Sequence, residues 1–164
     1  MHFSLIVITK PDQTVEDMMY PFEEVWDRYD HRTVEEHDGD EVYYTNPDSM
    51  WDWYQIGGRW AGLIEATDGE YGERSWGNED EPYEKGHYDT TLMAYVTSID
   101  PSCVHDVLTP DGVWHECETW HEELKSDEHP WGTFVKDPTF KTDFKKRFLD
   151  PYPDYRVTVV DYHS

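Results

Sequence analysis

Cysteine and long apolar runs are scarce in this chain. It has only two cysteines in 164 residues, Cys103 and Cys117, which is too few to suggest the disulfide framework of a small secreted protein. No apolar run reaches the roughly 18 residues that a transmembrane helix needs, and the sequence shows no signal peptide. These absences predict a cytoplasmic protein with no membrane-spanning segment and no membrane partner.

Basic residues are also scarce. The chain has 13 lysines and arginines against 37 aspartates and glutamates, which gives a formal net charge of −24. A surface of this charge repels phosphate backbones and anionic lipid, so direct binding to nucleic acid is not expected. It suits a basic protein partner or an acidic imitation of DNA, and general acidity of the source's proteins is the alternative explanation. The sequence leaves the oligomeric state open.

The common catalytic and metal-binding motifs are absent. The chain contains no H-E-x-x-H, no C-x-x-C and no G-x-x-x-x-G-K-[ST] sequence. No metal and no cofactor are therefore expected. The sequence does not decide between an enzyme and a binding protein, although it favours binding.

Aromatic residues, in contrast, make up 16% of the chain. A chain of this length and composition is expected to form one packed domain, 1–164. The continuous apolar run 3–9 is typical of a central strand buried on both faces. Thr14-x-x-Asp17 predicts the capped start of a helix, and Pro21 is expected to interrupt that helix.

Further strands and helices are predicted downstream. A short helix is expected from Thr119, and a longer one from Asp137 with three phenylalanines at every fourth position. The segment 67–89 is rich in glycine and acidic residues and is expected to be an exposed loop. The remaining expected elements are strands at 41–45, 59–66, 91–99 and 156–162 and a hairpin at 108–116. This order predicts an α+β fold, a ferredoxin-like mixed or antiparallel sheet with helices on one face and long acidic insertions.

The most distinctive stretch is 49–62, S-M-W-D-W-Y-Q-I-G-G-R-W-A-G, which holds three of the eight tryptophans. Aromatic side chains offer rigid faces for stacking, and Gly57 and Gly58 permit a sharp turn. The guanidinium of Arg59 suits a carboxylate or a phosphate. Asp52 is the nearest acceptor and is expected to hold Arg59 in place.

Two interpretations of this stretch are open. In the first, it forms a pocket that stacks a planar ring and binds an anionic group through Arg59. In the second, the aromatic residues belong to the core and an Asp52–Arg59 pair fixes the turn. The first interpretation makes the candidate ligand-binding residues Trp51, Asp52, Trp53, Tyr54, Gly57, Gly58, Arg59 and Trp60.

The same stretch resembles the K-W-D-W-Y-x-I-G-G-R-W-x-G signature of a family of small uncharacterised phage proteins, many of them from phages of actinobacteria. Only the leading lysine differs, and Met50 stands in its place. Other shared landmarks are P-F-E-E at 21–24, P-D-G-x-W-H-E at 110–116 and V-V-D-x-H at 159–163. The K-G-E-M-G-W segment of relatives is replaced by C-E-T-W-H at 117–121. The family has no established activity, so the resemblance implies only a phage accessory protein in the host cytoplasm.

Nine histidines raise the question of metal or acid–base chemistry. Asp161 and His163 are two positions apart on a predicted strand and therefore share a face, and His115 lies on the predicted hairpin. Together they would suit Zn²⁺ or Mn²⁺, or general acid–base attack on a phosphodiester. The alternative is that His163 is a terminal residue and His115 an ordinary strand residue.

Three functions follow from these features. The preferred one is a phage protein that binds a small anionic, nucleotide-like ligand and sequesters a host defence signal. The second is an acidic DNA mimic or inhibitor of a basic host protein. The third is a phosphoesterase that uses His115, Asp161 and His163.

Overall fold

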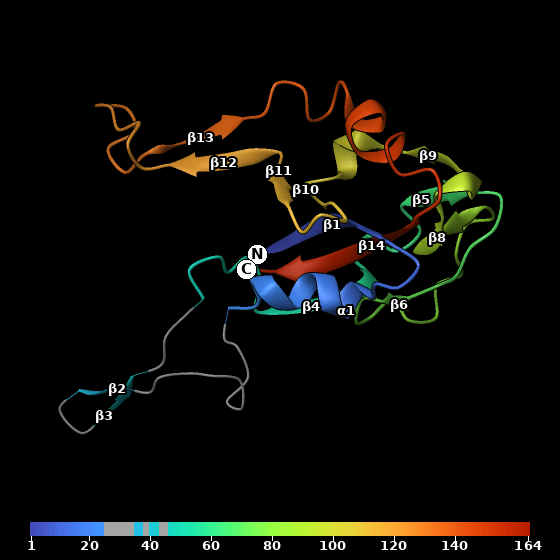
Figure 1. Ribbon diagram of the computed structural model, residues 1–164, viewed down its shortest axis with the longest axis horizontal. Helices are drawn as coiled ribbons and strands as arrows, with labels where there is room; N and C mark the ends of the chain where they lie inside the picture. The colour runs from blue at the N-terminus through green and yellow to red at the C-terminus, as the bar shows by residue number, and fades with distance from the viewer. Residues whose placement is uncertain (25–34, 38–39, 43–45) are drawn as a thin grey trace.

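A mixed sheet of seven strands forms the centre of the protein (Figure 1). The computed structural model describes residues 1–24, 35–37, 40–42 and 46–164. The sheet-rich fold with few helices confirms the α+β class at this coarse level.

The two longest strands lie side by side in this sheet. Strand β1 (His2–Thr9) is antiparallel to β14 (Arg156–His163) along its whole length and parallel to β10 (Asp106–Leu108) on its other side. The apolar run 3–9 is therefore a central strand, and the terminal strand predicted at 156–162 lies beside it.

Four further strands complete the sheet. β11 (Trp114–Glu116) forms the predicted hairpin with β10, and β4 (Trp53–Gly58) is antiparallel to β14. β6 (Glu73–Arg74) is parallel to the end of β4, and β8 (Thr90–Leu92) pairs with the start of β14.

Alternate residues of β1 face opposite sides of the sheet. Leu5 and Val7 pack with α1 (Val15–Met19), whereas Ile6 and Ile8 pack with a group of phenylalanines on the other side. The π-helical turn η4 (Lys145–Leu149) belongs to that second group, so helical segments cover both faces (Figure 1). The expectation of helices on one face is wrong, because a strand that is apolar at successive positions must be covered on both sides.

The start of α1 is the capping box that the sequence predicts. The Thr14 side chain accepts a hydrogen bond from the Asp17 backbone N–H, and the Asp17 carboxylate accepts one from the Thr14 N–H. The helix ends at Met19, and the 3₁₀ turn η1 (Tyr20–Phe22) follows with Pro21 inside it.

The segment from Asp137 consists of turns that end in η4 rather than one regular helix. Asp137 still caps it, because its Oδ1 accepts hydrogen bonds from the N–H groups of Thr139 and Phe140 at 2.9 and 3.1 Å. The three phenylalanines are buried and contact one another: Phe140, Phe144 and Phe148.

Two strand predictions need correction. Of the range 59–66 only β5 (Ile64–Ala66) is extended, because the chain turns directly after Gly58. The range 91–99 is divided by the 3₁₀ turn η2 (Met93–Tyr95). Its first part is β8, and its second part is β9 (Val96–Ile99), which joins β5 and β7 (His87–Tyr88) in a separate three-stranded sheet.

The helix expected from Thr119 is also wrong. That residue lies in β12 (Glu118–His121), which forms a two-stranded sheet with β13 (Thr133–Lys136). This hairpin extends away from the central sheet (Figure 1). The sequence at 118–121 fits a strand, with Thr119 and His121 on one face and Glu118 and Trp120 on the other, as well as it fits the start of a helix. The cross-strand pairing with β13 stabilises the strand.

The acidic segment 67–89 contains β6 and β7 and ends in a buried carboxylate. Asp89 is 0% exposed and accepts hydrogen bonds from the Gly62 N–H at 2.6 Å, the Gly72 N–H at 2.7 Å and the Tyr83 hydroxyl. One carboxylate therefore ties together two parts of the insertion and the turn after β4.

The remaining elements are short. β2 (Glu35–His37) and β3 (Asp40–Val42) form a hairpin that overlaps the strand predicted at 41–45, of which 43–45 lie outside the described residues. The 3₁₀ turn η3 (Pro101–Cys103) precedes β10, and both cysteines are free. Over the described ranges, no helix is long and apolar enough to cross a membrane.

Candidate functional site

The strand register places a row of polar side chains at one end of the central sheet. His2 lies opposite His163 and Ser4 opposite Asp161 in the β1–β14 ladder. Gln55 lies opposite Asp161 in the β14–β4 ladder. Because side chains alternate along strands, these residues share the face that further along is covered by the phenylalanines.

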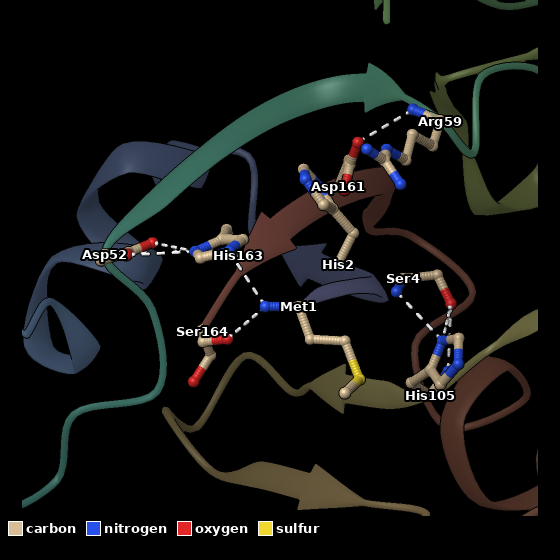
Figure 2. Close-up of polar contacts among 9 residues, drawn as sticks. All are labelled: Met1, His2, Ser4, Asp52, Arg59, His105, Asp161, His163 and Ser164. Carbon is tan, nitrogen blue, oxygen red and sulfur yellow. Dashed lines mark hydrogen bonds and ion pairs between the residues drawn. The ribbon is translucent and has the colours of Figure 1, made fainter.

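Asp161 is at the centre of this row (Figure 2). Its carboxylate is 1% exposed, its Oδ1 is 2.9 Å from Nδ1 of His2, and its Oδ2 accepts the backbone N–H of Arg59 at 2.9 Å. A buried carboxylate without hydrogen-bond partners is unfavourable, and these two contacts give each of its oxygens a partner. They also hold the carboxylate against rotation and orient the His2 ring.

The double glycine allows this close approach. Gly58 has φ +58°, and a Cβ added there would lie 2.5 Å from the Asp161 side chain. Gly57 has φ +82°, and its Cβ would lie 2.7 Å from Oδ2 of Asp89. The predicted sharp turn is therefore present at the end of β4, with a buried carboxylate against each glycine.

The side chain of Arg59 lies beside Asp161 and His2 (Figure 2). It lines a groove of about 820 Å³ that lies between the ends of β1, β14 and β4 and the segment after β6. Within the described part of the chain, its guanidinium forms no ion pair. The groove is lined by His2, Trp53, Gln55, Arg59, Glu73, Arg74, Ser75, Trp76, Asn78, Glu79 and Asp161.

The expected Asp52–Arg59 pair does not form. Asp52 is bonded to Nδ1 of His163 at 2.9 and 3.1 Å (Figure 2). The strand β4 separates Asp52 from Arg59, and a six-residue strand spans roughly 20 Å. Asp52 and Arg59 therefore lie at opposite ends of β4. Asp161, and not Asp52, holds Arg59 in place, through the backbone N–H of Arg59.

Three aromatic residues of the predicted pocket belong to the core instead. Trp51 is buried, donates its Nε1–H to the Met19 carbonyl at 2.9 Å and packs edge-on against Tyr54 on the α1 side of the sheet. Trp60 packs against the opposite core and the ring of His105. Of the aromatic side chains in the stretch, Trp53 lines the groove and is 46% exposed.

Arg74 is the second guanidinium of the groove, and sequence reasoning missed it. It stacks over the Tyr83 ring at 4.3 Å and donates to the Pro82 carbonyl at 2.9 Å, with Glu81 at 3.9 Å. These contacts hold it in one orientation. Trp76 was also missed, although it is 95% exposed beside the groove.

His2 is the other omission. The sequence contained part of the information that places His2 in the site. The two long terminal strands were candidates for pairing, and Asp161 and His163 were expected on one face of the last strand. The register that places His2 against Asp161 depends on long-range pairing, which neither strand encodes alone.

The set His115, Asp161 and His163 is not assembled. His115 packs on Phe148, and its Nε2 is 3.0 Å from the Thr109 hydroxyl. Burial lowers the pKa of His115, and Arg147 lowers it further. His163 bonds to Asp52 rather than Asp161. Among the described residues, no group of three or more histidines, cysteines and carboxylates is placed to hold a metal ion.

The groove has mixed charge. Two guanidiniums and His2 line it together with three carboxylates, of which Asp161 is bonded to His2 and Glu73 accepts a hydrogen bond from Gln55 at 2.8 Å. Glu79 accepts the Gly77 N–H, and backbone hydrogen bonds lower its pKa. Arg59 is thus the cation of the groove that is most available to a ligand.

Comparison with known proteins gave no relative: no family model, no curated protein and no solved structure matches this chain.

Proposed function

We propose that the protein binds a small anionic ligand with a planar ring, such as a nucleotide, in the groove between β4, β14 and the segment after β6. The observation that carries this proposal is the Arg59 guanidinium, which lines the groove beside Asp161 without a carboxylate partner of its own among the described residues. In a chain of net charge −24, an arginine without such a partner is an unusual local feature.

Two exposed tryptophans beside Arg59 suit the planar ring of such a ligand. Trp53 and Trp76 line the groove and are 46% and 95% exposed. Exposed tryptophans lose much unfavourable contact with water when a planar ring covers them, and each stacked base contributes about 1–3 kcal/mol. The groove volume of about 820 Å³ lies within the usual range for small-molecule sites.

Binding by Arg59 can be tested directly. We expect Arg59→Ala to weaken the affinity for nucleotides by about 10–100-fold, because it removes one charge-assisted hydrogen-bonding group. The melting temperature should hardly change, since the side chain is exposed and the contact to Asp161 uses the backbone. Isothermal titration with a panel of nucleoside monophosphates, triphosphates and cyclic nucleotides measures the affinity.

Arg156→Ala is the matched control, because Arg156 is paired with Glu70 at 3.6 Å outside this groove. It should leave the affinity unchanged. The proposal fails if no nucleotide in the panel binds, or if Arg59→Ala and Arg156→Ala weaken binding equally.

The family resemblance suggests a biological setting for such a ligand. A phage protein with this groove would sequester a host signalling nucleotide and so act against host defence. Binding without turnover is sufficient for that role. We further propose a ferredoxin-like relationship for the pair of β1 and β14, because the first strand lies inside the sheet and is antiparallel to the last.

A second candidate function is binding to a basic protein, which the β12–β13 hairpin favours. Trp120 and Phe134 pack edge-on on this hairpin and remain 47% and 61% exposed, and Trp131 is 80% exposed. An isolated two-stranded hairpin is marginal in water, and aromatic side chains are common anchors at interfaces.

A photo-crosslinking residue in place of Trp131 tests this second function. We expect it to capture a basic protein from the native host, and the purified partner should rebind with an affinity that falls as salt is raised. A crosslink to a second copy of the chain, or an affinity that does not depend on salt, would contradict it.

A further inference from the structure

We propose that His2 is a general base and that the groove hydrolyses phosphoanhydride or phosphodiester bonds. The leaving group of these bonds departs as an anion that needs no proton at neutral pH. This inference rests on the ligand-binding function proposed above and goes beyond it, because it assigns a reaction to the bound phosphate.

The His2–Asp161 contact orients the imidazole for this role. Asp161 is buried and fixed at both oxygens, by Nδ1 of His2 and by the N–H of Arg59, each at 2.9 Å. An ionised carboxylate accepts hydrogen bonds, so Nδ1 carries the proton and Nε2 has the free lone pair. The Nδ1–Asp161 contact is the one hydrogen bond of the His2 ring within the described part of the chain.

The imidazole is also accessible from the groove. The His2 side chain is 26% exposed and lines the same groove as Arg59. A phosphate held by Arg59 would therefore lie next to the imidazole, and the guanidinium would stabilise the charge that develops on the phosphoryl oxygens.

The neighbouring histidines, His163 and His105, lack either a free ring nitrogen or a place in the groove. The ring of His163 is 5.2 Å from that of His2, and its Nδ1 is also held by a carboxylate, but its Nε2 is engaged with the Met1 nitrogen at 2.9 Å. His105 is bonded through Nδ1 to Ser4 and does not line the groove. His2 is thus the base that a ligand in the groove would meet.

The proposed reaction uses one proton acceptor, the imidazole of His2. Nε2 of His2 takes a proton from water, the water oxygen bonds to phosphorus, and the bond from phosphorus to the leaving oxygen breaks with its electron pair on that oxygen. Among the described residues, no second imidazole lines the groove, so the leaving group must be a stable anion, such as a phosphate or an acidic phenol. The proton on His2 passes to solvent through the open groove.

The pH dependence of this step is set by several charges around His2. The ionisable groups that face His2 or line its groove are Asp161, Arg59, His163, Glu73, Arg74 and Glu79. A general base acts only in its unprotonated form, so the rate should rise with pH through one ascending limb.

The experiment uses the untagged protein with thymidine 5′-(p-nitrophenyl phosphate), bis(p-nitrophenyl) phosphate and ATP as substrates. We expect His2→Gln to lower kcat by about 100–10,000-fold and to abolish the ascending limb. The affinity for a non-hydrolysable nucleotide analogue should stay within about 3-fold of the unaltered protein, because Arg59 and the tryptophans remain. His129→Gln is the matched control, because this exposed histidine lies outside the groove, and it should keep the rate and the limb.

A second variant guards against loss of folding. His2→Ala should be inactive and should regain activity when imidazole is added, which a purely structural defect would not allow. The inference is overturned if the unaltered protein binds nucleotide without releasing product, and the binding proposal then stands. It is also overturned if His2→Gln keeps both the rate and the limb. If nucleotides neither bind nor react, both proposals fall.

Discussion

Replacement of Gly58 with alanine is expected to destabilise the protein by about 2–5 kcal/mol. The left-handed backbone at φ +58° contributes about 1–2 kcal/mol of this cost for a residue with a Cβ. Overpacking contributes about a further 1–3 kcal/mol, because the new Cβ would lie 2.5 Å from both Cβ and Oδ2 of Asp161. Chemical denaturation of the two proteins measures the difference.

Gly112→Ala is the control for the backbone contribution. Gly112 has φ +81°, but nothing lies within 4 Å of its added Cβ. It should therefore show the cost of the left-handed backbone alone, about 1–2 kcal/mol. Equal destabilisation by the two substitutions would show that Asp161 moves aside freely, and would contradict the rigid placement on which the His2 contact depends.

The same substitution links the fold to the candidate site. Asp161 contacts Gly58 on one side and His2 on the other, so a displaced carboxylate would release the imidazole. Where Gly58→Ala remains folded, we expect nucleotide binding or turnover to decrease together with stability. The glycine pair is thus a requirement of the site as well as of the turn.

Local signals in the sequence were sufficient for several elements. The apolar run that became β1, the capping box at Thr14 and the hairpin around Gly112 each depend on neighbouring residues, and each lies where it was predicted. The two terminal strands were also identified, because β-branched residues and aromatic residues dominate them.

Long-range pairing explains the predictions that were wrong. The range 91–99 reads as one strand, yet it is divided at Met93 because its two halves pair with strands of different sheets. Asp52 and Arg59 are close in sequence, but an extended strand holds them apart. Sequence proximity predicted contact where the backbone conformation excludes it.

The candidate site illustrates the same limit. Arg59, Trp53 and the two glycines were identified from composition, whereas His2, Arg74 and Trp76 come from other parts of the chain. Exposure of a tryptophan is not encoded by its neighbours. One of the two sequence interpretations placed Trp51 and Trp60 in the same pocket as Trp53, and the other, which the structure bears out for these two residues, placed them in the core. The resemblance to phage proteins remains a prediction.

Asp106→Asn is expected to stabilise the protein at pH 7 and to have little such effect at pH 4. Asp106 is 6% exposed and accepts a hydrogen bond from the Tyr162 hydroxyl. Burial raises the pKa of Asp106 from 3.8 to about 6. The hydrogen bond from Tyr162 offsets part of this rise, and the neighbouring Glu116 adds a smaller rise. The same burial and the carboxylate raise the pKa of the Tyr162 phenol, which therefore stays protonated and continues to donate.

The sign follows from the direction of the shift. Because the folded protein holds the Asp106 proton more tightly than the unfolded chain, its contribution is most favourable below about pH 4. That contribution is lost as the pH rises through about 6. A shift of about two pKa units corresponds to about 3 kcal/mol. Asparagine keeps an acceptor for Tyr162 and has no charge to bury, so the stability difference between variant and parent should grow by about 3 kcal/mol from pH 4 to pH 7.

Asp111→Asn provides a comparison of opposite sign. The hydrogen bond from Thr109 lowers the pKa of Asp111, so the contribution of this exposed carboxylate is lost as the pH falls. The variant should therefore be less stable than the parent at pH 7, and the two should converge in acid. Urea denaturation at a series of pH values measures the free energy of unfolding of both variants and the parent. In the difference between variant and parent, the contributions of the other ionisable groups cancel. A stability difference for Asp106→Asn that stays constant from pH 4 to pH 7 would show that Asp106 titrates normally in the folded protein, and that the end of β10 is open to water despite its burial under Tyr162.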